Sequence, residues 1–409
     1  MADDRTLRTH VALFSVAHGI GVIAPLLTTP YLARVLGPTG WAPVLLAQSL
    51  AALVALLVEF GFDLTGTQQL AQAPTDRARG EVIAGVLSAR LVLLPAAGAL
   101  ALVGAAAIPA LHADWGLVSW GLAAAVTRGA SPLWVFQGIG RPEGAVLAEV
   151  AAKVAAALGV LLFVHGPHDG WRVLALQAGA GAISVGWLLR RARGLVPWPP
   201  LSRLSAGHAL HAAWPVFAFR GAGASYLHAN VLILGALADP ITVTMYASAD
   251  RLVRAGINLF APLTQALFPR VSRAMREGSA AAGRARQEAV QLVGGTGVGL
   301  SLLFVVGASP LVRMLLGPGY DAAVPLVRGL AALPTLIGIG TVLGIHWAIP
   351  SGRQRVFLRI VVLAGLANLA VATLLVPAWG AWGMVVATTT AEAWVAGALL
   401  TLYRRSDPA

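Results

Sequence analysis

The chain has 409 residues, of which 57% are hydrophobic and 11% are charged, and its formal net charge is +12. Soluble domains carry about 25% charged residues, so this composition excludes a soluble globular protein. The chain contains no cysteine, which excludes disulfide bonds and thiolate metal sites, and no cofactor is expected.

Apolar runs of about 20 residues recur along the whole chain, and each can cross a hydrocarbon core about 30 Å thick. They lack the alternation of barrel strands, and lipid cannot satisfy an open backbone, so they predict helices. The first predicted helices are 11–36, 41–62, 82–108, 115–136, 144–164 and 171–189. After a basic, proline-rich linker at 190–208, the others are 213–237, 242–268, 289–308, 322–349, 356–376 and 381–402.

This pattern predicts an all-α polytopic membrane protein with about 12 transmembrane helices in two six-helix lobes. The N-terminal lobe is placed at 1–193, the cytoplasmic linker at 194–212 and the C-terminal lobe at 213–409. Both lobes start on the same side of the membrane, so we expect parallel repeats. The polar N-terminus precedes a long apolar run without a small-residue cleavage site, which predicts that the first helix is a retained signal anchor.

Arginine is distributed unevenly between the two sets of loops. With the N-terminus inside, the outer loops carry only Arg172 and Arg313. The inner side carries Arg5, Arg8, Arg77, Arg79, Arg141, Arg190, Arg191, Arg193, Arg203, Arg270, Arg273, Arg276, Arg284, Arg286, Arg353, Arg355, Arg404 and Arg405. The positive-inside rule therefore predicts cytoplasmic N- and C-termini. Basic residues spread over short loops indicate membrane orientation, and no nucleic-acid partner is expected.

Basic residues also occur inside the predicted helices, where each costs at least about 2.5–3.5 kcal/mol at the bilayer centre. They are Arg34, Arg90, Arg128, Lys153, Arg220, Arg251, Arg254, Arg328 and Arg359. Most must line water, pair with acids or snorkel. Snorkelling is the simpler interpretation for Arg34, Arg328 and Arg359, which lie near helix ends. Lys153 follows Glu149 by four residues, which suits an ion pair within one helix.

Two groups of embedded arginines are harder to explain by snorkelling. Arg90, Arg128 and Arg220 lie at similar depth toward the cytoplasmic face, which favours a basic inner vestibule. Arg251 and Arg254 lie near the midplane of their helix, where snorkelling reaches poorly. Pairing of Asp250 with Arg254 at i,i+4 spacing would leave one arginine uncompensated. The alternative is a purely structural network between the lobes.

The membrane-embedded acids are Glu149, Asp250 and Glu392. In transporters such acids often carry a coupling proton or sodium ion. For Glu392, a hydrogen bond in a helix contact is the alternative. Asp250, Glu149, Lys153 and Glu392 are therefore candidates for ion coupling or for charge pairing.

Prolines in the predicted helices indicate kinks, because each removes a backbone hydrogen bond. Pro25 and Pro30 are expected to interrupt the first helix and Pro215 to start the seventh, and Pro262 and Pro334 lie in the eighth and tenth. Bent helices at corresponding places in both lobes suit alternating access.

Several short motifs resemble those of one transporter family. They are YLARVLGP at 31–38, EFGFDLTGT at 59–67, WVFQG at 134–138, NVLILG at 230–235, YASADRLVR at 246–254 and QALFPRVS at 265–272. In this order and spacing they resemble bacterial Wzx-type polysaccharide flippases of the multidrug/oligosaccharidyl-lipid/polysaccharide (MOP) exporter superfamily. The segment 59–67 resembles the loop after the second helix of that family.

The resemblance implies two six-helix lobes facing a central cavity. It also implies transport of an undecaprenyl-diphosphate-linked oligosaccharide from the inner to the outer leaflet of the bacterial cytoplasmic (inner) membrane. The exported units build O-antigen, capsule or exopolysaccharide, and polysaccharide polymerase machinery is a possible partner.

The embedded residues suit such a substrate chemically. Arginine stays charged and donates two hydrogen bonds to phosphate, so Arg251, Arg254, Arg220, Arg90, Arg128 and Arg34 are the candidates for binding the diphosphate. Sugars need amides and aromatic faces, which Asn230, Tyr246 and Gln137 could supply. Trp134, Trp214 and Tyr226 are further candidates, although tryptophan at the ends of helices is more often an interfacial anchor.

Other functions remain open at this point. A multidrug exporter of the same superfamily would favour an acidic cavity, and a lipid II flippase would carry arginine in the first helix, where residues 19–30 have none. A membrane-bound sugar polymerase or glycosyltransferase would need larger outer loops, and the chain has no HExxH, Walker A or GxSxG motif. A scaffold would need no midplane arginines. A transporter without a hydrolytic motif is therefore the favoured interpretation.

Overall fold

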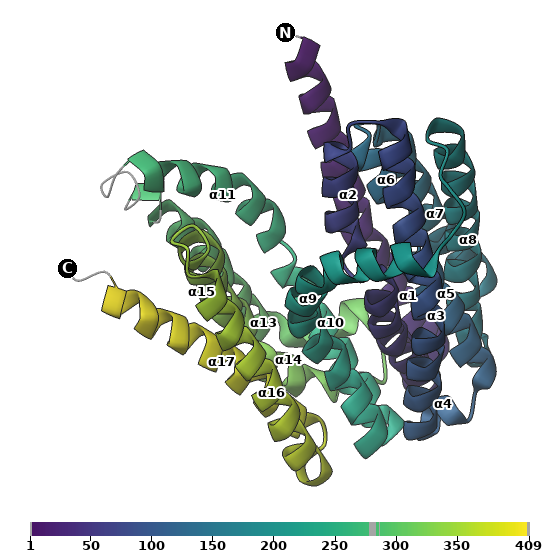
Figure 1. The fold of residues 1–409 in the computed structure, drawn as a ribbon. Helices are drawn as coiled ribbons and strands as arrows, with labels where there is room; N and C mark the ends of the chain where they lie inside the picture. The colour runs from purple at the N-terminus through teal and green to yellow at the C-terminus, as the bar shows by residue number, and fades with distance from the viewer. Residues whose placement is uncertain (1, 278–283, 286, 407–409) are drawn as a thin grey trace. The chain divides into compact units, whose positions relative to one another are not determined.

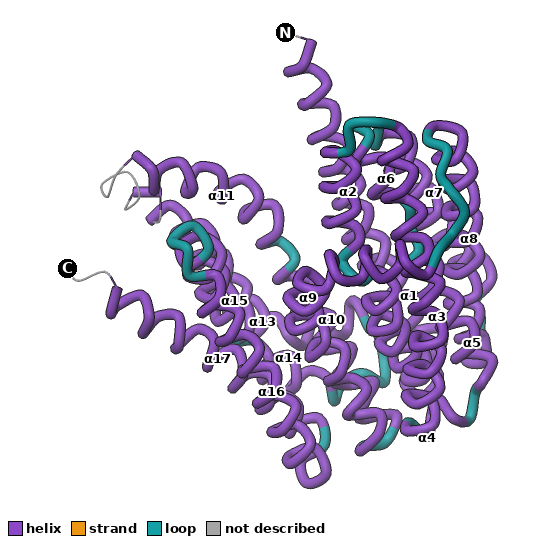
Figure 2. The backbone as a smooth tube through the Cα atoms, viewed as in Figure 1, coloured by secondary structure: helices purple, strands orange, loops and turns teal. Residues whose placement is uncertain are grey.

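The computed structural model describes residues 2–277, 284–285 and 287–406, and its described parts are helices joined by short turns, without a strand (Figure 2). The chain forms two compact units, Met1–Ala224 (unit 1) and Ser225–Ala409 (unit 2). Among the described residues, eight helical stretches are long and apolar enough to cross a membrane. The prediction of an all-α polytopic membrane protein is confirmed, and about 12 spans remain the expected number.

Unit 1 is a bundle around the long helix α1 (Figure 1). Its helices are α1 (Ala2–Glu59), α2 (Phe62–Gln72), α3 (Asp76–Ala107), α4 (Pro109–His112), α5 (Trp115–Gly129), α6 (Leu133–Gly138), α7 (Glu143–Phe163), α8 (Gly170–Leu195) and the first part of α9 (Arg203–Leu237). Helix α1 packs against α3, α5, α7 and α8, while α2 packs against α6. A short 3₁₀ turn, Pro167–Asp169, connects α7 to α8.

The first two predicted helices are the two helical stretches of α1, which meet at the non-helical residue Gly37, whose φ is 66°. Helical geometry continues through Pro25 and Pro30, so the predicted interruption at these prolines is wrong. The left-handed region is open to glycine without a steric cost, and therefore Gly37 is where the chain departs from the helix.

Segment 59–67 is mostly helical and not the loop that the resemblance implied. Helix α1 ends at Glu59, a two-residue turn follows, and α2 begins at Phe62. Both turn residues are left-handed, with φ of 48° at Phe60 and 79° at Gly61. The non-helical linker between the two helices is shorter in the structure than predicted. Helix α8 continues to Leu195, and α9 starts at Arg203. Pro215 accordingly lies inside α9 and does not begin a helix.

Unit 2 contains the end of α9 and the remaining helices. These are α10 (Pro240–Ile257), α11 (Phe260–Glu277), the π-helical turn η2 (Val290–Gly294), α13 (Gly295–Leu315), α14 (Ala323–Leu330), α15 (Leu333–Leu343), the π-helical turn η3 (Gly344–Ala348), α16 (Gln354–Trp379) and α17 (Ala381–Ser406). Helix α16 packs along α17, and α10 packs against α14.

Two predicted helices of unit 2 are divided just before a proline. The predicted helix 242–268 consists of α10 and part of α11, with a turn at 258–259 ahead of Pro262. The predicted helix 322–349 breaks between α14 and α15, ahead of Pro334. The kinks expected at these two prolines are therefore confirmed, because proline lacks the backbone N–H that a helix interior uses and is best accommodated in the first turn of a helix.

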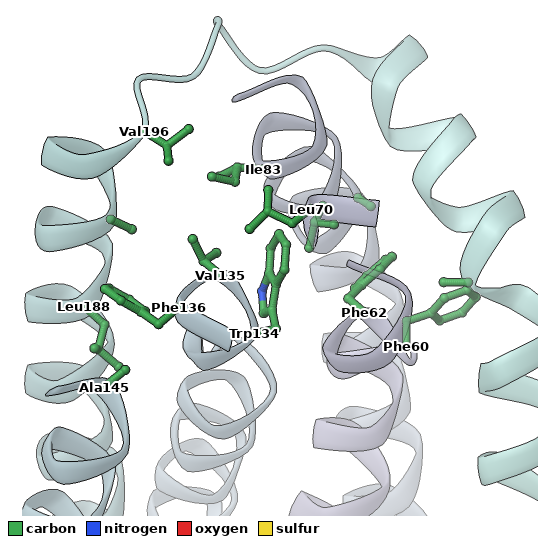
Figure 3. Packing of buried hydrophobic residues seen from close by; sticks show 14 of the residues in the cluster. Phe60, Phe62, Leu70, Ile83, Trp134, Val135, Phe136, Ala145, Leu188 and Val196 are labelled. Carbon is green, nitrogen blue, oxygen red and sulfur yellow. The ribbon is translucent and has the colours of Figure 1, made fainter. Parts of the chain in front are cut away.

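The core of unit 1 is a cluster of buried apolar side chains from α2, α3, α6, α8 and α9 (Figure 3). Trp134 on α6 lies in this cluster beside Leu70 and is 2% exposed. A β-carbon at Gly66 would lie 2.7 Å from the Trp134 ring, so α2 approaches α6 as closely as glycine allows. Trp134 is thus a core residue in this structure and does not present a face to a sugar.

Candidate functional site

The first candidate site is an acid–arginine cluster in unit 1. Glu59 ends α1, Asp63 lies in the first turn of α2, and Arg220 lies on α9. The Nη1 atom of Arg220 lies 2.7 Å from both carboxylate oxygens of Asp63 and 3.4 Å from Oε1 of Glu59. The three side chains are 32–39% exposed, so the group is neither fully buried nor freely solvated.

The turn between α1 and α2 brings the two acids to the same arginine. Phe60 in this turn stacks on Phe217 of α9, with ring centroids 4.2 Å apart and an interplanar angle of 10°. A non-glycine residue with positive φ is uncommon and persists where surrounding contacts hold it. The stacking therefore fixes α9 against the turn, and Arg220 lies one helical turn beyond Phe217.

Arg90 is fully enclosed and binds backbone rather than an acid. It is 5% exposed, and its guanidinium donates to the carbonyl oxygens of Ala130 (2.7 Å) and Ser131 (3.1 Å), just after the end of α5. Carbonyls at a helix end lack helical partners and carry partial negative charge, so a buried cation is stabilised there. The charges of Arg90 and Arg128 also act on Glu59, which joins these predicted residues electrostatically to the cluster.

Other predicted residues of unit 1 lie apart from this cluster. Arg34 is exposed and lies before the kink at Gly37, whereas Glu59 ends the helical stretch that follows the kink. Gln137 is half-buried on α6. The carboxylate of Glu149 accepts a short hydrogen bond from the hydroxyl of Ser131. Lys153 is exposed, and the ion pairs of the described residues do not join it to Glu149.

The second candidate site lies on α10 in unit 2. Nε of Arg254 lies 2.7 and 2.9 Å from the two carboxylate oxygens of Asp250, which is 7% exposed. The predicted i,i+4 pair is thus present. Arg251 also has an interaction partner.

A buried network of neutral polar groups joins four helices of unit 2. Asn230 of α9 donates from Nδ2 to Thr388 of α17 at 3.0 Å, and Tyr246 of α10 lies at hydrogen-bonding distance from the same hydroxyl, also 3.0 Å. Asn368 of α16 donates to Oδ1 of Asn230 at 2.6 Å. Glu392, one turn after Thr388 on α17, is 8% exposed and has a partner of its own.

Asn230 and Tyr246 are buried, with exposures of 1% and 0%, so in this structure they are positioned to hold helices together rather than to touch a substrate.

The sequence did not predict four residues of these clusters, namely Glu59, Asp63, Asn368 and Thr388. Polar residues inside apolar runs are candidates for functional sites in membrane proteins, and this signal alone would have identified Glu59 and Asn368. Tyr226 and Trp214 remain untested candidates: the side chain of Tyr226 lies outside the described residues, and Trp214 is 57% exposed on α9.

Chemically, both sites combine fixed arginines with carboxylates. Such groups attract anions and can exchange one acidic partner for another. Among the residues that the structure describes, no group of three or more His, Asp or Glu side chains could hold a metal ion.

The fold is that of the MOP exporters. One similar solved structure is described as the lipid II flippase MurJ in an inward closed conformation, with a TM-score of 0.73 and 12% identity over 96% of this chain and 87% of that one. Another is an inward-facing multidrug resistance transporter of the MATE family, with a TM-score of 0.64 and 14% identity over 94% and 100% of the two chains.

Residues 7–275 match the family described as "Polysaccharide biosynthesis protein", and the chain belongs to this family. Two relatives carry the name "Putative O-antigen transporter". The one from Escherichia coli (strain K12) is 27% identical over 89% of this chain and 88% of its own length. The one from Shigella dysenteriae is 26% identical over 94% and 97%. The resemblance to Wzx-type members of the MOP superfamily is thereby confirmed, and the protein is a multi-pass membrane exporter of that superfamily.

Proposed function

We propose that the protein is a flippase that moves an undecaprenyl-diphosphate-linked oligosaccharide from the inner to the outer leaflet of the bacterial inner membrane by alternating access. The observation that carries the proposal is the pair of acid–arginine sites, one in each unit, within a polysaccharide biosynthesis family member. The two relatives named as O-antigen transporters support the same substrate class.

Within this proposal the arginines have distinct roles. Arg251 and Arg254 bind the diphosphate, because guanidinium groups donate two hydrogen bonds to phosphate oxygens and remain charged in a medium of low dielectric constant. In unit 1, the exposed Arg128 contributes positive charge, whereas the charge of Arg220 is already balanced by Asp63 and Glu59. Arg90 has the role of a buried support, since its guanidinium is already bound to backbone carbonyls.

The acids have a complementary role. Asp250 holds Arg254 in place when no substrate is present, and an incoming diphosphate competes with it for the guanidinium. Glu149 and Glu392 remain candidates for proton or sodium coupling. The proposed lobes are 1–193 and 213–409, with a cytoplasmic linker at 194–212, cytoplasmic termini and a possible association with polymerase machinery.

Leaflet translocation of a fluorescent undecaprenyl-diphosphate oligosaccharide by the purified protein in liposomes tests the proposal. We expect protein-dependent movement that falls at least about tenfold in the variant Arg251→Gln/Arg254→Gln, since charge-assisted hydrogen bonds contribute about 1.5–3 kcal/mol each. Arg77→Gln/Arg141→Gln, which removes two exposed arginines from unit 1, is the matched control and should retain movement.

Three results would count against the proposal. Movement that is equal in the double variant and the wild type would exclude Arg251 and Arg254 as the anion site. Export of a cationic dye without movement of the lipid-linked sugar would identify a multidrug exporter. Movement of lipid II in preference to the oligosaccharide would assign the other lipid-linked substrate of the superfamily.

A further inference from the structure

One end of unit 2 gathers aromatic and basic side chains from several helices. The ring centroid of Phe268 on α11 lies 6.4 Å from that of His346 in η3. The neighbouring Trp347 contacts Tyr403 of α17 edge-on, with centroids 5.2 Å apart, and the guanidinium of Arg353 lies 5.0 Å from the Trp347 ring centroid. These contacts place α11, η3, the start of α16 and the end of α17 at the same end.

Candidate membrane spans begin or finish at this end. Gln287–Leu315 and Gln354–Trp379 begin here, while Ala323–Ala348 and Ala381–Arg405 finish here. The end therefore lies at the depth where apolar helices meet the polar region of a bilayer. Trp and Tyr concentrate at this depth because their rings are apolar and their edges are polar. The distribution of arginine predicts that this side faces the cytoplasm.

Helix α11 is amphipathic, and its apolar side is already used. Leu267, Val271 and Ala274 are buried, and Leu267 packs in a core cluster with Phe260. The opposite side exposes Arg270 and Arg273. A helix that is apolar toward its own bundle and basic on the other side presents a charged surface rather than an unpartnered apolar one.

Positive charge dominates the described residues at this end. The exposed arginines are Arg270, Arg273, Arg284, Arg355, Arg404 and Arg405. Among the described residues, the acid that lies with these arginines is Glu288. Its Oε1 atom lies 3.3 Å from Nη1 of Arg270. The side chain of Arg270 nevertheless remains 65% exposed, so a surface pair of this kind leaves the guanidinium accessible to another anion.

We propose that this end of unit 2 binds the phosphate headgroups of anionic phospholipids in the inner leaflet. Clusters of arginine next to transmembrane helices bind anionic lipids through Coulomb attraction and through hydrogen bonds to phosphate oxygens. Arg353 and Tyr403 would lie beside the glycerol region, the buried Trp347 would hold Tyr403 and Arg353 in place, and Arg270, Arg273 and Arg404 would contact the headgroups. The proposal concerns the surrounding lipid and does not depend on which substrate is transported.

Native mass spectrometry of the full-length protein in detergent, titrated with phosphatidylglycerol or with phosphatidylcholine, tests this proposal. We expect the wild type to retain phosphatidylglycerol in preference to phosphatidylcholine. The variant Arg270→Gln/Arg273→Gln/Arg404→Gln should bind phosphatidylglycerol roughly tenfold more weakly or worse. Binding should also weaken as salt rises, because exposed charges are screened over about 8–10 Å at 0.1–0.15 M.

Two further variants test whether lipid binding depends on these particular positions or only on the net charge of the protein. Arg77→Gln/Arg141→Gln/Arg313→Gln removes the same number of exposed arginines elsewhere and should keep the preference. Arg270→Lys/Arg273→Lys/Arg404→Lys preserves the charge and should restore most of the binding, which also shows that the changed positions allow folding. Unaltered phosphatidylglycerol binding by the glutamine variant, or an equal loss in the control, would overturn the proposal.

Discussion

Asp63 and Glu59 approach the same nitrogen atom of Arg220, but at different distances. Asp63 has both oxygens at 2.7 Å, whereas Glu59 approaches to 3.4 Å. Coulomb attraction and hydrogen bonding both strengthen as the distance shortens. Asp63 is therefore the main partner of Arg220 in this structure, and Glu59 is a second carboxylate within reach of the same guanidinium.

We expect Asp63→Asn to lower the free energy of unfolding by about 1–2 kcal/mol, because it leaves a half-buried guanidinium without its closest partner. Glu59→Gln should cost less than about 1 kcal/mol. Thermal unfolding of the purified variants in detergent, followed by tryptophan fluorescence, measures both. In an Arg220→Met background the effect of Asp63→Asn should largely disappear. A larger cost for the Glu59 variant would reverse the assignment.

Gly66 gives a second prediction for single residues. Gly66→Ala should destabilise unit 1 by about 1–3 kcal/mol, because the added methyl group meets the Trp134 ring at 2.7 Å in a packed core. Gly98→Ala on α3 is the matched control, since nothing lies within 4 Å of the added group, and it should be neutral or stabilising by about 0.5–1 kcal/mol. Equal melting temperatures for the two variants would contradict the close α2–α6 contact.

Among the elements, α10 begins at a well-defined cap. Oδ1 of Asp239 accepts hydrogen bonds from the backbone of Ile241 (2.9 Å) and Thr242 (3.0 Å), and the Thr242 hydroxyl donates to Oδ2 at 2.6 Å. The hydrogen bond from the Thr242 side chain, followed by the backbone ones, lowers the pKa of Asp239. The cap holds the start of the helix that carries Asp250, Arg251 and Arg254.

We expect Asp239→Ala to destabilise the protein by about 1 kcal/mol at pH 7. Because the folded pKa is lowered, this contribution is present above the usual aspartate pKa of about 3.9 and is lost as the pH falls through the folded value. The gap in melting temperature between the wild type and the variant should therefore shrink at acidic pH. Asp239→Asn, which keeps an acceptor oxygen, should remain nearly as stable as the wild type and lose this pH dependence.

The sequence was sufficient to predict features that depend on residues close to one another along the chain. The Asp250–Arg254 pair is four residues apart and was predictable, as were the breaks before Pro262 and Pro334. Arg220 lies 157 residues from Asp63, and Asn230 lies 158 residues from Thr388, and no rule for a single chain connects residues at that separation. Most of α2 and the second half of α11 were missed because these helices are too polar to form an apolar run.

At the scale of the whole molecule, the distribution of arginine predicts a definite topology that can be mapped directly. The natural chain has no cysteine, so single substitutions carry no labelling background. His168→Cys, in the exposed turn between α7 and α8, should react with an impermeant maleimide once the outer membrane is opened. Arg77→Cys and Arg405→Cys should react only after the inner membrane is permeabilised. The opposite pattern would invert the predicted orientation.

Helix α9 continues without a break across the division between the compact units at 224/225. Ala206 and Ala213 of this helix belong to the buried core of unit 1, yet they follow the non-helical segment 196–202. A gene cut between Pro199 and Pro200 would therefore leave the N-terminal fragment without part of its own core. The two pieces should be insoluble or degraded when expressed singly and should restore one another when expressed together. In genetic terms, we expect the two fragments to complement one another and not to behave as independent domains.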